Sequence, residues 1–354
     1  VFLRGGADGL TLVPPHGDDA YYRSRPTLAV AKNDLISLDD RFGLNPSLAP
    51  LESLYKEGQM GVVHAVGSGD STRSHFEAMS AMERGAHNDR SSLRSGWLAR
   101  HLNTTTSTSP MRAVALSPVM PESLGGGTQA LAIESLEDFK LPDESKAFSD
   151  ALNSLYASGD DPLTEAGRAS LRILDQLQGF DASQIGAKGY PAGRFGLALS
   201  QVAFLVRQEV GLEIAALELG GWDSHVAQEQ LITGLMTQLA QGLKAFNDDL
   251  GSEMKRVTVL VQTEFGRRVS ENSGLGTDHG RGSVMFALGG GVIGGQVITD
   301  WPGIERDKIV GPGDLKVTSD YRDVLAEALR YRLGNGRVDE VFPRHNLSRV
   351  GLFT

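Results

Sequence analysis

The stretch from residue 257 to residue 282 constrains the fold more than any other. It opens with VTVLV, a nearly continuous run of β-branched and aliphatic residues, and this run stops at Thr263 and Glu264. A short apolar run of this kind predicts a strand that is covered on both faces in a parallel sheet. A loop rich in glycine, serine and asparagine then leads to Asp278 and His279. Because ligands collect at the carboxyl ends of such strands, we expect these residues to line one crevice; a surface turn and a solvated loop are the alternative.

Two further strand ends repeat this arrangement. The run VFL leads into RGGADG, which places Asp8 at the end of a strand, and the run LEIAALEL leads into GGWDSH, which places Asp223 and His225. Carboxylate and imidazole groups at one sheet edge are suitable ligands for a divalent cation such as Zn, Mn, Ca or Mg. A turn at Asp8 and capping of the next helix by Asp223 are the alternatives. The predicted ligands are Asp8, Asp223, His225, Glu264, Asp278 and His279.

A strand, a turn of small residues and a helix follow one another between residues 60 and 83. The strand MGVVHAV leads through GSGDSTRSH into an amphipathic helix whose apolar positions begin at Phe76. A hydroxyl group at the start of a helix lies beside unpaired N–H groups, which favour a bound or developing anion. Capping of the helix by serine or threonine is the alternative. The candidates are Ser74 as the nucleophile, Ser71 or Thr72 in its place, and Arg73 and His75 beside it.

Composition excludes several classes of protein. The 354 residues are 40% hydrophobic, which is enough for one large α/β domain or two smaller ones. A formal net charge of −10 is unsuited to binding nucleic acid, because phosphate groups require a basic surface. Without cysteine, a metal ion would depend on histidine and carboxylate ligands. No apolar run approaches the ~20 residues of a membrane span. The sequence is also compatible with an N-terminal export signal that is not part of this chain.

Residues 120–195 differ from the rest of the chain, because they are polar and interrupted by proline and glycine. Their helical pattern is confined to short stretches, of which 163–178 is the clearest, and they contain no histidine. We predict a single domain over 1–354, in which 120–195 is an insertion that caps the sheet and sets substrate choice. The run NTTTSTS at 103–109 is predicted to be a surface loop.

Six short motifs follow one another along nearly the whole chain: FLRGGADG, RSHF, GWL, GWDSH, EFGR and GTDHG. Together they resemble the DUF1501 family of bacterial exported proteins. Because that family is similar to the alkaline phosphatase and sulfatase superfamily, the resemblance implies a three-layer α/β/α fold with a mostly parallel sheet. Members usually carry a twin-arginine export signal, so the resemblance also implies a periplasmic or cell-envelope location.

The resemblance also implies roles for single residues. Asp8 is similar to the first metal-binding aspartate of the superfamily, Ser74 to its hydroxyl nucleophile, and His279 to its final histidine ligand. Asp223 and His225 are similar to the aspartate and histidine of one metal site. One residue separates these two here, whereas the superfamily usually has three between them.

A second departure from the superfamily also affects the metal site. Glu264 and Phe265 stand where the superfamily has aspartate and histidine, so that phenylalanine replaces an imidazole ligand. This departure implies a weakened site with a single ion, or no ion at all. In the latter case the chain would be a non-catalytic envelope protein that binds a glycan or a protein partner.

The function that we expect is metal-assisted hydrolysis of a small phosphate or sulfate ester, phosphorylated or sulfated glycans included. Ser74 would attack phosphorus or sulfur, and Arg73 or Arg267 would hold the anionic group. His75 or His279 would protonate the leaving group. A phosphate ester is favoured over a sulfate ester, because the sequence around Ser74 lacks the Cys/Ser-x-Pro-x-Arg context in which sulfatases form formylglycine.

Overall fold

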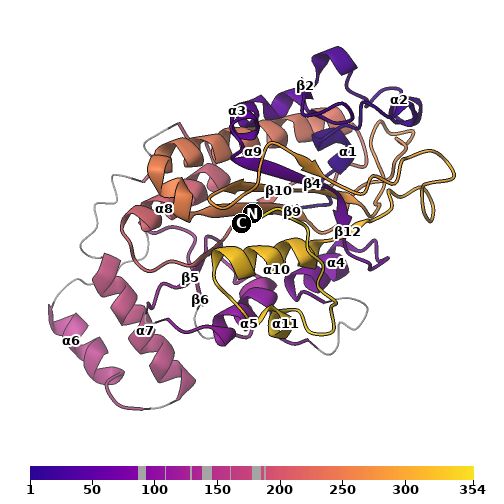
Figure 1. Cartoon of the computed structure of the whole chain (residues 1–354). Coiled ribbons are helices and arrows are strands. Elements are labelled where there is room, and N and C mark those ends of the chain that lie inside the picture. Colours follow the sequence, from indigo (N-terminus) through magenta and orange to yellow (C-terminus); the bar gives the residue numbers. More distant parts are fainter. Residues whose placement is uncertain are drawn as a thin grey trace.

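The computed structural model is a mixed α/β structure (Figure 1) that describes residues 1–86, 93–107, 109–127, 130–137, 146–159, 161–177, 185–186 and 189–354. Among these residues, the α-helices are α1 (Gly9–Leu12), α2 (Asp19–Ser24), α3 (Glu52–Lys56), α4 (His75–Glu83), α5 (Trp97–Thr104), α6 (Lys146–Leu155), α7 (Pro162–Leu177), α8 (Arg194–Arg207), α9 (Gln228–Leu250), α10 (Tyr321–Arg332) and α11 (Val338–Val341). The strands are β1 (Phe2–Arg4), β2 (Ile36–Ser37), β3 (Gly43–Leu44), β4 (Met60–Gly67), β5 (Ala113–Ala115), β6 (Ala130–Ala132), β7 (Ile214–Ala216), β8 (Glu218–Gly220), β9 (Thr258–Thr263), β10 (Ser283–Gly289), β11 (Val297–Ile298) and β12 (Ser319–Asp320).

The central sheet has the strand order β11-β4-β10-β9-β1-β8, and β12 also pairs with β4. β1 runs parallel to β8 and β9, and both β11 and β12 run parallel to β4. β10 is antiparallel to its two neighbours, β4 and β9. The sheet is therefore mostly parallel, as predicted. The carboxyl ends of β1, β4, β8 and β9 share one edge with the amino end of β10.

Helices cover both faces of this sheet (Figure 1), because side chains along its strands alternate between two cores. In β10, Val284 and Phe286 belong to the core that contains residues of α8 and α9. Met285, between them, belongs to the core that contains residues of α5, α10 and α11. The neighbouring strand β4 alternates in the same way, with Val62 in the first core and Val63 in the second.

The single strand expected at 212–219 is two strands in two different sheets. β7 joins a small sheet of order β6-β5-β7, whereas β8 joins the central sheet beside β1. Leu217 lies between the two strands and is buried in the core. The apolar pattern does not reveal this crossing, because both strands have a buried face and the pattern continues through the bend.

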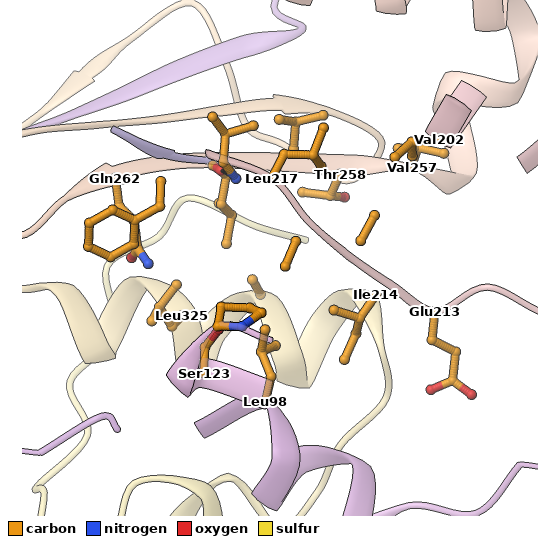
Figure 2. A pocket seen from close by; sticks show the side chains of 18 of the residues that line it. Leu98, Ser123, Val202, Glu213, Ile214, Leu217, Val257, Thr258, Gln262 and Leu325 are labelled. Carbon is orange, nitrogen blue, oxygen red and sulfur yellow. Dashed lines mark hydrogen bonds between the residues drawn. The ribbon is translucent and has the colours of Figure 1, made fainter. Parts of the chain in front are cut away.

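The run 257–261 is less buried than its sequence predicts. β9 pairs with β10, but its pairing with β1 begins only at Gln262. Thr258 and Leu260 are therefore half-buried and line a cavity of about 280 Å³ between the sheet and α10. Figure 2 shows Thr258 and Gln262 across this cavity from Leu325 of α10. None of the predicted site residues is among the described residues that line it.

The helices of the segment 120–195 do not lie over the edge where the parallel strands end. α6 and α7 project at one end of the molecule, and Figure 1 shows them far from α4. The segment is anchored by the small sheet, in which β6 pairs with β5. That the segment 120–195 caps the site stays a prediction, and α6 and α7 themselves lie away from α4. Residue 178, the predicted end of the helix 163–178, lies outside the described residues.

None of the described helices is both long and apolar enough to cross a bilayer.

Candidate metal centre

Four strand ends deliver polar side chains to one edge of the central sheet. His75 begins α4, which follows β4, and Asp223 follows β8. Glu264 comes directly after β9, and His279 lies shortly before β10. Because β10 is antiparallel, its amino end reaches the edge at which the other strands end. The sheet topology therefore brings together residues that are far apart in the sequence.

The centre of this site is a single carboxylate oxygen, Oδ1 of Asp223. It lies 3.4 Å from Nε2 of His75, 3.1 Å from Nε2 of His225 and 3.3 Å from Nε2 of His279. The Nε2 atoms of His225 and His279 are themselves 2.8 Å apart. The side chains of Asp223 and His225 are 47% and 42% exposed, so solvent reaches the site from their side. We call these four residues the histidine cluster.

The other ring nitrogen of each histidine in the cluster faces an oxygen atom. Nδ1 of His75 lies 2.7 Å from Oε1 of Glu264. Nδ1 of His279 lies 2.7 Å from the backbone oxygen of Arg73. A carbonyl or an ionised carboxylate only accepts hydrogen bonds, so we assign the hydrogen to Nδ1 in both rings. Nε2 then presents its lone pair to Asp223.

His225 is held in the same way by Asp278. Its Nδ1 lies 3.4 Å from Oδ1 of Asp278, and that oxygen also accepts a hydrogen bond of 3.2 Å from Nδ2 of Asn272. Arg268 donates to the second oxygen of Asp278 at 3.2 Å. The bond from Asn272, above all, and the contacts with His225 and Arg268 lower the pKa of Asp278 against the opposing effect of burial. Asp278 therefore stays ionised and acts as an acceptor.

With the ring hydrogens assigned to Nδ1, the histidine cluster brings four lone pairs together. Within the described part of the chain, Nε2 of His75 is buried and has no hydrogen-bond partner. The ligand atoms of His75, Asp223 and His279 all lie within 4.8 Å of one another. Lone pairs at such distances repel, and a cation between them turns this repulsion into attraction. Three imidazoles with anchored far nitrogens and one carboxylate suit a first-row divalent ion such as zinc or manganese.

Arg267 holds Asp223 rather than a substrate. Its guanidinium group is fully buried and donates to Oδ1 of Asp223 at 2.8 Å. It also donates to the backbone oxygens of Gly6, Thr277 and Trp222. Burial raises the pKa of Asp223, but the hydrogen bond and the charge of Arg267 outweigh burial and bring this pKa down to about 2. The sequence predicts a contact of Arg267 with an anionic substrate, whereas in the structure its donors are bound to Asp223 and to backbone oxygens.

Glu264, a predicted ligand, orients His75 instead. Its side chain is fully buried, and it also accepts hydrogen bonds from the amide of Gly5 at 2.8 Å and from the hydroxyl of Thr263 at 3.0 Å. Burial raises the pKa of Glu264, but the bond from His75 and the backbone bonds lower it overall. The same bond with Glu264 raises the pKa of His75. Glu264 therefore acts on the site through the ring of His75.

His75 belongs to the set of possible ligands, although the sequence placed it beside the nucleophile as an acid. Phe265, which stands at the expected position of an imidazole, packs against this set. Its ring centre lies 4.8 Å from that of His75 and 4.9 Å from that of His279. An imidazole ring thus lies beside Phe265 from the start of α4. The signal was present in the sequence, because His75 also follows a buried strand and a turn of small residues.

Asp8 lies in a buried ion pair. The side chains of Asp8 and Arg25 have no exposed surface. The oxygens of Asp8 also accept hydrogen bonds from Thr11 at 2.8 Å, from Gln228 at 2.7 Å and from the amide of Leu10 at 3.2 Å. Burial raises the pKa of Asp8, but Arg25 lowers it overall. Asp8 was predicted as a metal ligand, but in the structure these donors occupy its lone pairs and it is not part of the histidine cluster.

The predicted nucleophile, Ser74, and its neighbour Arg73 differ in the interactions that their side chains make. Arg73 forms an ion pair with the buried Asp314, so it is not free to hold an anionic group. Ser74 occupies the N-cap position of α4, yet among the described residues its side chain makes no capping bond. The hydroxyl of Thr72 donates a hydrogen bond of 2.7 Å to a glutamate of α4. Ser74 therefore keeps a hydroxyl group directly before His75 in the chain.

A comparison with protein-family models matches residues 1–331 to DUF1501, a protein family of unknown function. The chain belongs to the DUF1501 family. A search of curated proteins and a search of solved structures find no match. The residues of the histidine cluster lie within the matched range.

Proposed function

We propose that this DUF1501 protein is a metal-dependent hydrolase of small phosphate or sulfate esters, with phosphate preferred. The convergence of three imidazole nitrogens on Oδ1 of Asp223 is the observation that carries the proposal. The histidine cluster would hold a single divalent ion. Zinc or manganese is favoured over calcium or magnesium, because nitrogen atoms are the majority of the donors.

The residues of the cluster would set the electrostatics of the reaction. When bound, a divalent cation would draw electron density from the ester group and make its phosphorus or sulfur atom easier to attack. Asp223 would supply a fixed negative charge, since its pKa of about 2 keeps it ionised. Glu264 and Asp278 would keep two of the imidazole rings oriented, with the lone pairs of Nε2 directed at the ion.

Ser74 is the proposed nucleophile. Its Oγ would form a bond to phosphorus or sulfur as the ester oxygen leaves, and the proton of the hydroxyl would pass to solvent. Water would then break the new bond, release phosphate or sulfate, and restore the hydroxyl. The acid role expected of His75 and His279 does not fit this arrangement. Their Nε2 atoms face Asp223, and their Nδ1 atoms are bonded to Glu264 and to a backbone oxygen. The leaving group would therefore take its proton from solvent.

The proposal includes a relation to alkaline phosphatases and a location outside the cytoplasm. The relation is supported by a mostly parallel sheet with helices on both faces, and by a candidate site at the carboxyl ends of its strands. A periplasmic or cell-envelope location rests on the resemblance to exported proteins alone.

A second candidate function is that of a non-catalytic envelope protein which binds a glycan or a protein partner. One observation favours it. Arg73 and Arg267, which were predicted to hold the anionic group, are engaged with Asp314 and Asp223. Such a protein would not depend on a metal ion.

Metal analysis of the purified protein, combined with assays on p-nitrophenyl phosphate and p-nitrophenyl sulfate, tests the proposal. We expect a stoichiometric transition-metal ion, and turnover that is lost on chelation and restored by zinc or manganese. His279→Ala should lose the ion. His345→Ala is the matched control and should keep it, because His345 pairs with Asp323 outside the cluster. Absence of a stoichiometric ion would contradict the metal centre, and metal binding without turnover of either ester would favour the binding protein.

A further inference from the structure

Exposed apolar side chains stand beside the histidine cluster in the chain. Phe76 follows His75 and is 84% exposed, the largest exposed fraction among the large hydrophobic residues that the structure describes. Val226 follows His225 and is 61% exposed. Leu275 lies in the loop that leads to the last histidine of the cluster, and it is 51% exposed. We call Phe76, Val226 and Leu275 the apolar rim.

The fold gains little from Phe76 in this position. The sequence predicts Phe76 on the buried face of α4, but the buried residues of this helix are Ala78, Ala81, Met82 and Glu83. A side chain that stays exposed contributes almost no burial of apolar surface to folding. The phenyl ring is therefore available for contact with a ligand.

The backbone beside the rim is strained. Leu275 has φ of 57°, and Ala227, next to Val226, has φ of 49°. This left-handed conformation is unfavourable for residues other than glycine. The two segments are bonded to each other, because the amide of Ala227 donates to the oxygen of Gly274 at 2.9 Å and the amide of Gln228 donates to the oxygen of Leu275 at 2.8 Å. Strain of this kind is concentrated at ligand sites.

Asn272 fixes the strained loop to the histidine cluster. Its Oδ1 accepts hydrogen bonds from the amides of Gly274 and Gly276 at 2.9 Å and 3.2 Å. Its Nδ2 donates to the backbone oxygen of His225 at 3.0 Å and to Oδ1 of Asp278 at 3.2 Å. The exposed leucine of the loop is therefore held in a defined position relative to two residues of the site.

The two arginines near the site are already paired with carboxylates. Arg73 is paired with Asp314, and Arg267 is paired with Asp223. An anionic group would thus be held by the metal ion, without help from these arginines. The remainder of the substrate would meet the apolar rim, where binding energy comes from removing apolar surface from water.

We infer that the apolar rim binds an alkyl or aryl group, so that the substrate is an anionic ester whose other end is apolar. The inference rests on the proposed function, in which the metal ion holds the anionic group. A phosphorylated or sulfated sugar is the competing class. Its hydroxyl groups would gain little from a valine and a leucine, because they would lose contact with water.

Binding of n-alkylphosphonates from methyl to octyl to the zinc-loaded protein tests the inference, because phosphonates bind without turnover. By calorimetry, we expect the affinity to rise roughly twofold to threefold per methylene group, somewhat less than for complete burial. Leu275→Gly, Phe76→Ser and Val226→Ser should each weaken this dependence. The same variants should leave the affinity for methylphosphonate unchanged, since they leave the metal ligands intact.

Two controls separate binding from folding. Leu275→Gly should keep or raise the melting temperature, because glycine adopts φ of 57° without strain. Val119→Ser changes a valine that is 71% exposed and lies outside the rim, and it should leave the phosphonate series unchanged.

Several outcomes would overturn the inference. They are an affinity independent of chain length in the native protein, equal chain-length dependence in the native protein and in the three rim variants, and tighter binding of glucose 6-phosphate than of octylphosphonate. Failure of the hydrolase proposal has a different signature. In that case the phosphonates would still bind with a dependence on chain length, while neither ester would be turned over.

Discussion

The Nε2 atoms of His225 and His279 lie 2.8 Å apart, although 54 positions separate the two residues in the chain. Their Nδ1 atoms face the carboxylate of Asp278 and the backbone oxygen of Arg73, which places the ring hydrogens on Nδ1. Two lone pairs at this distance require a proton or a metal ion between them. Burial, the strongest effect, lowers the pKa of His279 and so disfavours the proton. The geometry is therefore better suited to a metal ion.

Glu264→Gln should weaken metal binding by about 10-fold to 100-fold, because the charge that anchors Nδ1 of His75 is lost while every ligand is kept. The dissociation constant for zinc, measured by competition with a chelator, checks this. Glu271→Gln is the matched control, since Glu271 accepts hydrogen bonds from the amides of Thr27 and Leu28 instead. An unchanged dissociation constant in Glu264→Gln would show that Glu264 has no influence on the ligands.

Zinc at 100 times its dissociation constant should raise the free energy of unfolding by about 2.7 kcal/mol, because the ion binds the folded chain. Urea denaturation with and without zinc measures this difference. His279→Ala should show little of it. A zinc effect of equal size in that variant would place the binding site elsewhere.

Ser74→Ala should abolish hydrolysis and leave stability almost unchanged. A lost capping bond costs about 1 kcal/mol, but within the described residues Ser74 makes none from its side chain. A rate and a melting curve for the variant check both halves of the prediction. Ser71→Ala should retain activity. Full activity in Ser74→Ala would instead move the nucleophile to Ser71, Thr72 or solvent.

Asp8→Asn should destabilise the protein by about 3–5 kcal/mol, because it leaves the buried guanidinium of Arg25 without its counter-charge. Metal content should not change. In the native chain, the lowered pKa of Asp8 gives a contribution to stability that is present above pH 3.8 and is lost as the pH falls through the lowered value. Denaturation curves with metal analysis check this. Loss of the ion at unchanged stability would restore Asp8 as a ligand.

Stability should also fall in mildly acidic solution because of His64. Burial lowers the pKa of His64 from 6.5 to about 4, so its contribution is complete above pH 6.5 and declines by about 3 kcal/mol as the pH falls towards 4. His64→Gln should flatten this part of the profile. Part of the slope should persist, since burial also lowers the pKa of His101 to about 4. An unaltered slope in the variant would show that His64 is not responsible.

Those residues of the site whose neighbours in the sequence indicate a strand end could be predicted from the sequence. Asp223, His225 and His279 each stand beside an apolar run and glycine residues, which is the pattern of a strand that ends at a ligand. The topology then brings them together. His75 obeys the same rule, and only the serine before it suggested a different role.

The remaining roles depend on partners that are distant in the chain. Asp8 was predicted as a ligand because the sequence around it gives no sign that Arg25 would neutralise it. Arg73 was expected to be free, but its partner Asp314 is 241 positions away. Such ion pairs form through tertiary packing, and no periodicity or spacing in the sequence near either residue indicates them.

A bound ion would also connect parts of the chain that are distant in the sequence. It would join His75, Asp223 and His279, and the loop between the last two spans 56 positions. Holding the ends of such a loop together removes conformational freedom from the unfolded chain, as a disulfide does in a secreted protein. This chain contains no cysteine. The histidine cluster would therefore serve as its cross-link, one that forms and opens with the supply of metal.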